Sequence, residues 1–96
     1  MSEKQTKIKM IKGKTETGFE YELSQARLEN YELVETLGEV EENPLALPKV
    51  VNLLLGKEQA DNLKNHVRDD EGFVSTEKLT NEIMEVFQSQ KETKNS

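Results

Sequence analysis

Residues 47–56, Leu-Pro-Lys-Val-Val-Asn-Leu-Leu-Leu-Gly, are the most apolar stretch of the chain and decide its fold. On a helical wheel, their apolar side chains cover an arc wider than the stripe of about 100° that a one-sided surface helix shows. Pro48 suits the first turn of a helix, and Gly56 suits the left-handed position that follows one. The sequence therefore predicts a helix over 48–55 that is packed on more than one side.

The wide apolar arc of this helix has two interpretations. In the first, the helix is sandwiched between its neighbours and the whole arc belongs to the core. In the second, part of the arc binds a partner protein or another subunit, as exposed apolar patches often do. The candidate partner-binding residues are then Val50, Val51, Leu54 and Leu55. The width of the arc alone leaves both interpretations open.

Helical periodicity continues on both sides of the central helix. A helix over about 25–41 is predicted from apolar residues that share one face, with Ser24 as its cap and Asn43-Pro44 after its end. Two further helices are predicted over about 58–68 and 76–88. The three apolar faces comprise Leu33, Val34, Leu37 and Val40; Ala60, Leu63 and Val67; and Leu79, Ile83, Val86 and Phe87.

Ahead of the helices, residues 7–23 alternate with a period of two and predict a β-hairpin. Phe19, Tyr21 and Leu23 then face one way. Gly13 and Gly18 bracket the connection, where glycine can supply the positive φ angles that a turn often needs.

The two ends of the chain, 1–6 and 89–96, are polar and carry almost no apolar residues. We expect both to be disordered tails, because they have nothing to offset the entropy of ordering. A single domain over 7–87 remains. Its expected class is α+β, mainly α, with an N-terminal β-hairpin followed by about four short helices packed in one small domain.

Composition excludes several kinds of partner. The 96 residues carry a net charge of −6, which repels nucleic acid and anionic membrane surfaces. Without cysteine the chain forms no disulfides, so a reducing cytoplasm fits best. The longest apolar run is far shorter than the roughly 20 residues of a membrane-spanning helix, and the first residues do not read as a signal peptide.

The residues that could support catalysis are few. His66, the one histidine, falls at the edge of an apolar stripe and is expected to be a boundary residue without a chemical role. The carboxylate pairs Glu41-Glu42 and Asp69-Asp70 fall in turns that we expect to be exposed, where nothing shifts their pKa values for acid–base work. We therefore expect no catalytic residue, no cofactor and no enzymatic activity.

One stretch, 69–75, resembles the middle of a calcium-binding EF-hand loop. Placing Gly72 at the sixth position of that loop puts Val67 at the first position and Lys78 at the twelfth. Both positions need oxygen ligands, the twelfth a bidentate glutamate. A metal site is therefore not expected.

From Phe19 to Phe87 the chain resembles the tail assembly chaperones of long-tailed, siphovirus-type bacteriophages and prophages of Gram-positive bacteria. Four features carry the resemblance, in this order along the chain: Phe19, Tyr21 and Leu23 in a strand; Leu33, Glu35, Leu37 and Gly38 in a helix; the element Leu53-Leu54-Leu55-Gly56-Lys57-Glu58-Gln59; and Asp70-Glu71-Gly72-Phe73-Val74 before the last helix. The third element is the most specific of the four.

This resemblance implies a protein of the bacterial host cytoplasm that binds the long, helical tape measure protein and keeps it soluble while tail tube subunits assemble around it. It implies possible contact with the tail tube protein and absence from the mature virion. Such families often also make a longer, frameshifted product. Weak contacts by many copies along one client would coat it through avidity, and self-association of the chain is also possible.

Two other functional classes stay open on the sequence alone. The first is a structural phage tail or head-completion component, which would remain in the virion. The second is an acidic phage regulator that binds a host protein by imitating the charge of nucleic acid. Such a regulator would carry its carboxylates in a row on one face, whereas here they are scattered among 13 lysines and arginines.

Overall fold

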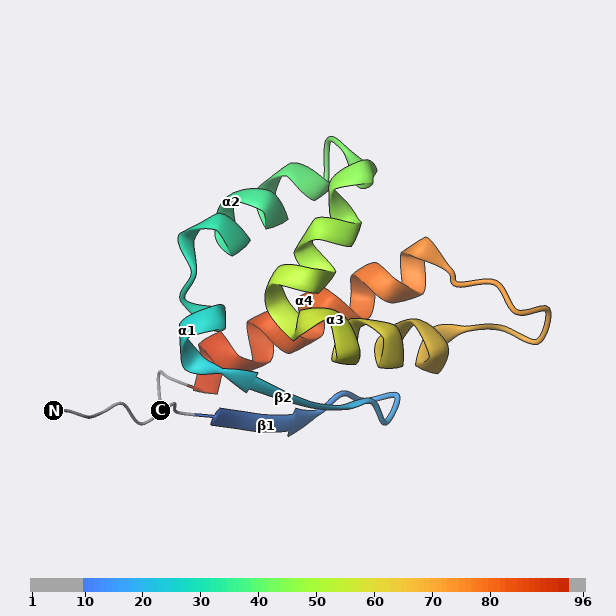
Figure 1. Ribbon diagram of the computed structural model, residues 1–96, viewed down its shortest axis with the longest axis horizontal. Coiled ribbons are helices and arrows are strands. Elements are labelled where there is room, and N and C mark those ends of the chain that lie inside the picture. The colour runs from blue at the N-terminus through green and yellow to red at the C-terminus, as the bar shows by residue number, and fades with distance from the viewer. Residues whose placement is uncertain (1–9, 94–96) are drawn as a thin grey trace, which may run out of the picture.

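The structure, a computed structural model, describes residues 10–93 of the chain. A two-stranded hairpin lies beneath a group of helices (Figure 1). The elements are β1 (Met10–Lys14), β2 (Glu20–Ser24), α1 (Gln25–Leu28), α2 (Tyr31–Val40), the 3₁₀ turn η2 (Pro44–Ala46), α3 (Leu47–Val67) and α4 (Thr76–Thr93). The predicted class, mainly helical with an N-terminal hairpin, is confirmed.

The hairpin presents one apolar face to the helices. β1 and β2 are antiparallel, with Ile11 opposite Leu23 and Gly13 opposite Tyr21. Phe19, Tyr21 and Leu23 are buried on the same side, as their alternation predicts. Because side chains in a strand alternate between its two faces, this spacing gives the hairpin one face for the core and one for solvent.

Gly13 and Gly18 have different structural roles in the hairpin. Gly18 has a φ of 100°, as expected for a turn. Gly13 lies inside β1 and is not among the described glycines with positive φ, which corrects the prediction for it. The ring of Tyr21 extends across Gly13, so that any Cβ there would collide with it. Gly13 is therefore required for close packing rather than for turning.

The helix predicted over 25–41 is divided into α1 and α2. The Oδ1 of Asn30 accepts from the backbone N–H of Glu32 and starts a new helix, while Ser24 caps the short α1 as predicted. Val34 is then exposed, although Leu33 is fully buried. The apolar face predicted over Leu33, Val34, Leu37 and Val40 is therefore wrong at Val34.

Helix α3 contains the two helices predicted over 48–55 and 58–68 as two arms that meet at Gly56. This residue has φ 82° and ψ 165°, a conformation that is essentially restricted to glycine. The side chain of Arg27 donates to the carbonyls of Asn52 and Leu53, at 3.3 and 2.9 Å. Gln59 Nε2 donates to the carbonyl of Leu55 at 3.0 Å. These donors satisfy carbonyls that the end of the first arm leaves open.

The final helix is longer than predicted. α4 continues to Thr93, so the tail predicted over 89–96 is wrong for 89–93. Gln90 Nε2 donates to the hydroxyl of Tyr21 at 2.9 Å, which ties the last turns to the hairpin. This contact joins residues 69 positions apart and has no signal in local composition. The tail predicted over 1–6 lies outside the described residues.

We expect Gly56→Ala to lower the free energy of unfolding by about 1–3 kcal/mol, because alanine rarely adopts this backbone conformation. Gly38→Ala is the matched control. Gly38 lies inside α2 with open space around its Cα, so alanine there should raise stability by roughly 0.5–1 kcal/mol. Urea denaturation measures both changes. Equal or greater stability of Gly56→Ala would show that the bend does not depend on glycine.

Candidate functional site

The four residues predicted to bind a partner all lie in the core. Val50, Val51, Leu54 and Leu55 are 0%, 3%, 0% and 3% exposed. Their arm of α3 is covered because α3 packs against α1, α2, α4 and β2. In this conformation the arc is the centre of the fold and a partner can reach little of it, although Val51 also lines the surface hollow described next. The interpretation of the arc as a docking surface stays a prediction.

A partly apolar hollow lies beside the bend of α3, and we call it the elbow groove. It has a volume of about 380 Å³. The side chains around it come from η2, from both arms of α3 and from the start of α4. They are Pro44, Leu45, Leu47, Pro48, Val51, Asn52, Ala60, Lys64, Thr76 and Leu79. The bend at Gly56 brings the two arms of α3 to the same groove, so the backbone conformation of one residue shapes this site.

Leu45 is the most exposed large apolar residue at the elbow groove, with 86% of its surface accessible. Asn43 fixes the short turn that carries it, because Asn43 Oδ1 accepts from the N–H of Leu45 at 3.2 Å. Pro44 occupies the first position of η2. Leu45 was not predicted as a site residue, although the turn between Pro44 and Pro48 is an unusual place for an exposed leucine.

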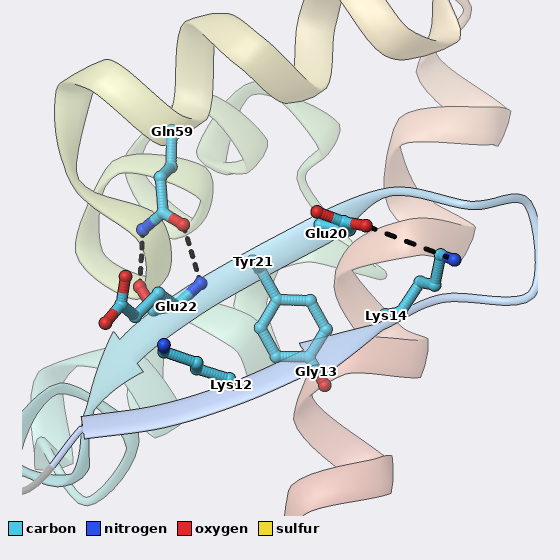
Figure 2. A pocket seen from close by; sticks show the side chains of 7 residues that line it. All are labelled: Lys12, Gly13, Lys14, Glu20, Tyr21, Glu22 and Gln59. Atoms are coloured by element: carbon cyan, nitrogen blue, oxygen red, sulfur yellow. Dashed lines mark hydrogen bonds and ion pairs between the residues drawn. The ribbon is translucent and has the colours of Figure 1, made fainter.

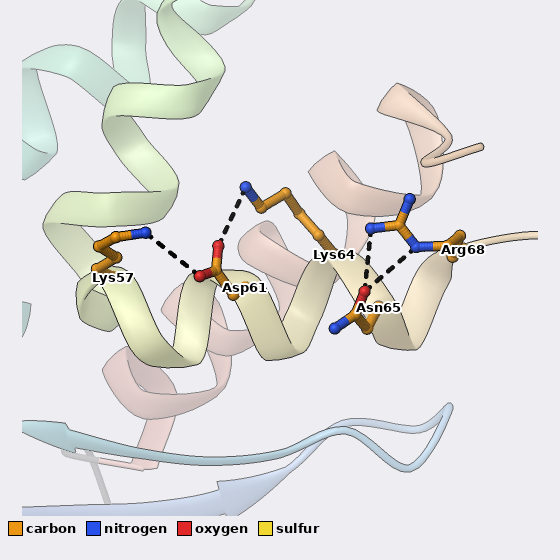
Figure 3. A network of polar contacts seen from close by, with 5 residues as sticks. All are labelled: Lys57, Asp61, Lys64, Asn65 and Arg68. Carbon is orange, nitrogen blue, oxygen red and sulfur yellow. Dashed lines mark hydrogen bonds and ion pairs between the residues drawn. The ribbon is translucent and has the colours of Figure 1, made fainter. Parts of the chain in front are cut away.

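Polar contacts follow the outer surface of the second arm of α3 (Figure 3). Asp61 forms ion pairs with Lys64 at 3.2 Å and with Lys57 at 3.4 Å. Hydrogen bonding from Lys64 and then from Lys57 lowers the pKa of the Asp61 carboxyl. Since Lys64 also lines the elbow groove, this arm gives the apolar hollow a charged rim.

A second group of side chains connects the hairpin turn to α3 and α4. The Thr17 hydroxyl donates to Glu82 Oε2 at 2.7 Å, and His66 Nε2 lies 2.9 Å from the same hydroxyl oxygen. Because that hydroxyl gives its hydrogen to Glu82, His66 Nε2 is the donor in the second contact. His66 is exposed and its ring lies against Phe19, with centroids 5.6 Å apart.

Glu82 is a buried carboxylate, 5% exposed. Its Oε1 atom is buried and has no hydrogen-bond partner among the described residues. Burying such an oxygen costs about 1–3 kcal/mol. The sequence carried a signal for it, since Glu82 stands between Leu79 and Val86 at helical spacing and so falls on the apolar face of α4.

The acidic turn after α3 uses its own carboxylate to hold itself closed. Asp69 Oδ1 accepts from the backbone N–H groups of Glu71 and Phe73, both at 2.9 Å. Arg68 donates to the carbonyl of Gly72 at 2.7 Å. Over residues 10–93, no group of three or more histidine, aspartate or glutamate side chains is placed to hold a metal ion. Asp69 therefore serves the turn itself.

Comparisons with protein-family models, with curated proteins and with solved structures found no match for this chain. None of the described helices combines the length and the apolar composition that crossing a lipid bilayer requires.

We expect Glu82→Met to leave the free energy of unfolding unchanged or to raise it by up to about 1 kcal/mol, because methionine removes a buried acceptor without a partner. Thr17→Val is the matched variant. It removes the donor to Oε2, so that neither carboxylate oxygen of Glu82 keeps a described hydrogen-bond partner, and it should lower stability by about 1–3 kcal/mol. Thermal and urea denaturation measure both changes. A loss of more than about 1 kcal/mol in Glu82→Met would show that the carboxylate stabilises the fold.

Proposed function

We propose that this chain is a non-enzymatic tail assembly chaperone of a long-tailed bacteriophage or prophage. In this proposal it binds apolar helical segments of the tape measure protein in the elbow groove and keeps that protein soluble during tail assembly. The observation that carries the proposal is an apolar hollow beside a leucine that is 86% exposed. An exposed leucine at the rim of such a groove is the kind of anchor that an amphipathic helix can cover.

The composition of the groove supports a helical client. Its apolar side chains come from η2, α3 and α4, while Asn52, Lys64 and Thr76 add polar groups. An apolar centre with a polar rim is the usual anatomy of a protein-binding surface. The net charge of −6 favours solubility of a chaperone–client complex.

The residues behind the family resemblance have structural roles in this fold. Gly56 bends α3, and Gln59 bonds to both Leu55 and the hairpin. Phe19 and Tyr21 are core residues. These residues hold the fold together, so in the proposal the choice of client falls to groove residues such as Leu45.

The proposal includes the host cytoplasm as the place of action, possible contact with the tail tube protein, possible self-association and absence from the mature virion. A structural tail or head-completion component is the main alternative, and a regulator that binds a host protein is another. Mass spectrometry of purified particles separates the first alternative from a chaperone, because a virion component is retained in stoichiometric amounts.

The proposal requires a tape measure protein encoded near this chain. We expect co-expression with that protein to render it soluble and to allow both to be purified together. Leu45→Asp should abolish this effect, since it places a charge at the apolar rim without disturbing the core. Tyr31→Asp is the matched control. Tyr31 is 72% exposed at the start of α2 and is not among the residues that line the groove, so this variant should retain the client.

Circular dichroism and denaturation must first show that both variants are folded. If the wild-type chain leaves the tape measure protein insoluble, the chaperone proposal is overturned. If the wild-type chain and Leu45→Asp solubilise it equally well, the chaperone function survives and the assignment of the client to the elbow groove is wrong.

A further inference from the structure

The outer edge of β2 is closed by a side chain instead of a strand. Gln59 Oε1 accepts from the backbone N–H of Glu22 at 2.7 Å, and Gln59 Nε2 donates to the carbonyl of Glu22 at 2.6 Å (Figure 2). The amide of Gln59 thus makes the two bonds that a neighbouring strand would make. The N–H and C=O of Glu22 therefore point away from β1.

The same geometry fixes where the backbone of β1 points. Lys12 is the register partner of Glu22. In an antiparallel ladder, a residue whose N–H and C=O point outward faces a partner whose groups also point outward. Lys12 therefore directs its N–H and C=O away from β2, and by alternation Met10 and Lys14 do the same. No described element pairs with this edge of the sheet.

The strand at the open edge carries two lysines, and two glutamates lie one strand further from the edge. Lys12 and Lys14 are exposed on the solvent face of the hairpin, opposite Glu22 and Glu20. The Lys14–Glu20 pair has its charged atoms 4.0 Å apart and is well exposed, so it holds Lys14 only weakly. A hollow of about 590 Å³ lies across both strands of the hairpin, and Lys12, Lys14, Glu20 and Glu22 all line it (Figure 2). On this face the lysines are therefore nearer the open edge than the glutamates are.

We propose that the outer edge of β1 binds an extended acidic peptide segment of another protein by strand addition. Backbone bonds from Met10, Lys12 and Lys14 supply the affinity. Alternating acidic side chains opposite Lys12 and Lys14 supply the selectivity, because opposite charges across strands attract. A second copy of β1 would place lysines opposite lysines, a repulsion that edge strands use to prevent self-pairing.

This site is separate from the elbow groove, which η2, α3 and α4 form. Its test does not depend on the proposed function. The probe is a short, terminally blocked peptide in which glutamate alternates with valine. We expect it to shift the backbone amide signals of Met10, Lys12 and Lys14 in nitrogen-15 correlation spectra and to slow their hydrogen exchange.

Two variants at one position separate backbone pairing from charge. Lys12→Pro removes the outward N–H, and proline is tolerated on an edge strand where that group faces solvent. We expect it to weaken peptide binding roughly tenfold or more. Lys12→Thr keeps the N–H and removes only the charge, so it should weaken binding by a smaller, salt-sensitive factor. Circular dichroism confirms that each variant is folded.

Three outcomes would overturn the inference. The first is the absence of amide shifts in β1 with saturating peptide. The second is equal binding of a matched peptide with lysine in place of glutamate, which would remove the role of charge. The third is self-association of the wild-type chain that Lys12→Pro abolishes, which would make a second copy the occupant of this edge.

Discussion

The bend of α3 at Gly56 is the constraint on which the rest of the fold depends. A straight helix through residues 47–67 would carry the second arm away from the hairpin and from α4. With the bend, Leu63 of the second arm and Leu54 of the first both lie in one core with no exposed surface. The bend leaves backbone carbonyls without helical partners, and Arg27 and Gln59 satisfy them by donating to the carbonyls of Asn52, Leu53 and Leu55. One glycine and two polar side chains therefore allow both arms of α3 to pack into the same core.

In this arrangement, the residues that stabilise the fold differ from those available to bind a partner. The most apolar residues of the chain are used to hold the elements together, so surfaces for partners must come from what the core leaves outside. The two surfaces proposed above are the elbow groove beside Leu45 and the outer edge of β1, where Lys12 and Lys14 are exposed. The first suits an apolar helix and the second suits an extended acidic segment. Because different elements form them, a partner could occupy each one independently.

Sequence patterns predicted those parts of the fold that depend on local periodicity. The alternation of Phe19, Tyr21 and Leu23 gave the hairpin, and Gly56 marked the end of a helix. Long-range polar contacts were not predictable: nothing near Gln90 indicates that it bonds to Tyr21, and nothing near Gln59 indicates Glu22. The docking residues could not be chosen from the sequence, because an arc such as that of Val50 and Leu54 looks the same whether neighbouring elements or a partner cover it. Leu45 was not predicted because Asn43 and Pro44 indicate a turn in the backbone but do not indicate whether an apolar side chain in that turn is exposed.

The hairpin is synthesised before the other described elements, but several of its polar contacts are made with α4, the last of them. Its polar partners stand late in the sequence: Glu16 bonds to Glu85, Thr17 to Glu82, and Tyr21 to Gln90. Contacts of such separation form slowly, because the intervening loop must close before they can stabilise anything. During translation, the contacts between the hairpin and α4 therefore form only after α4 has been synthesised. A chain released before α4 was made would lack the contact of Gln90 with Tyr21, and exposed apolar surface of this kind makes incomplete chains prone to aggregate.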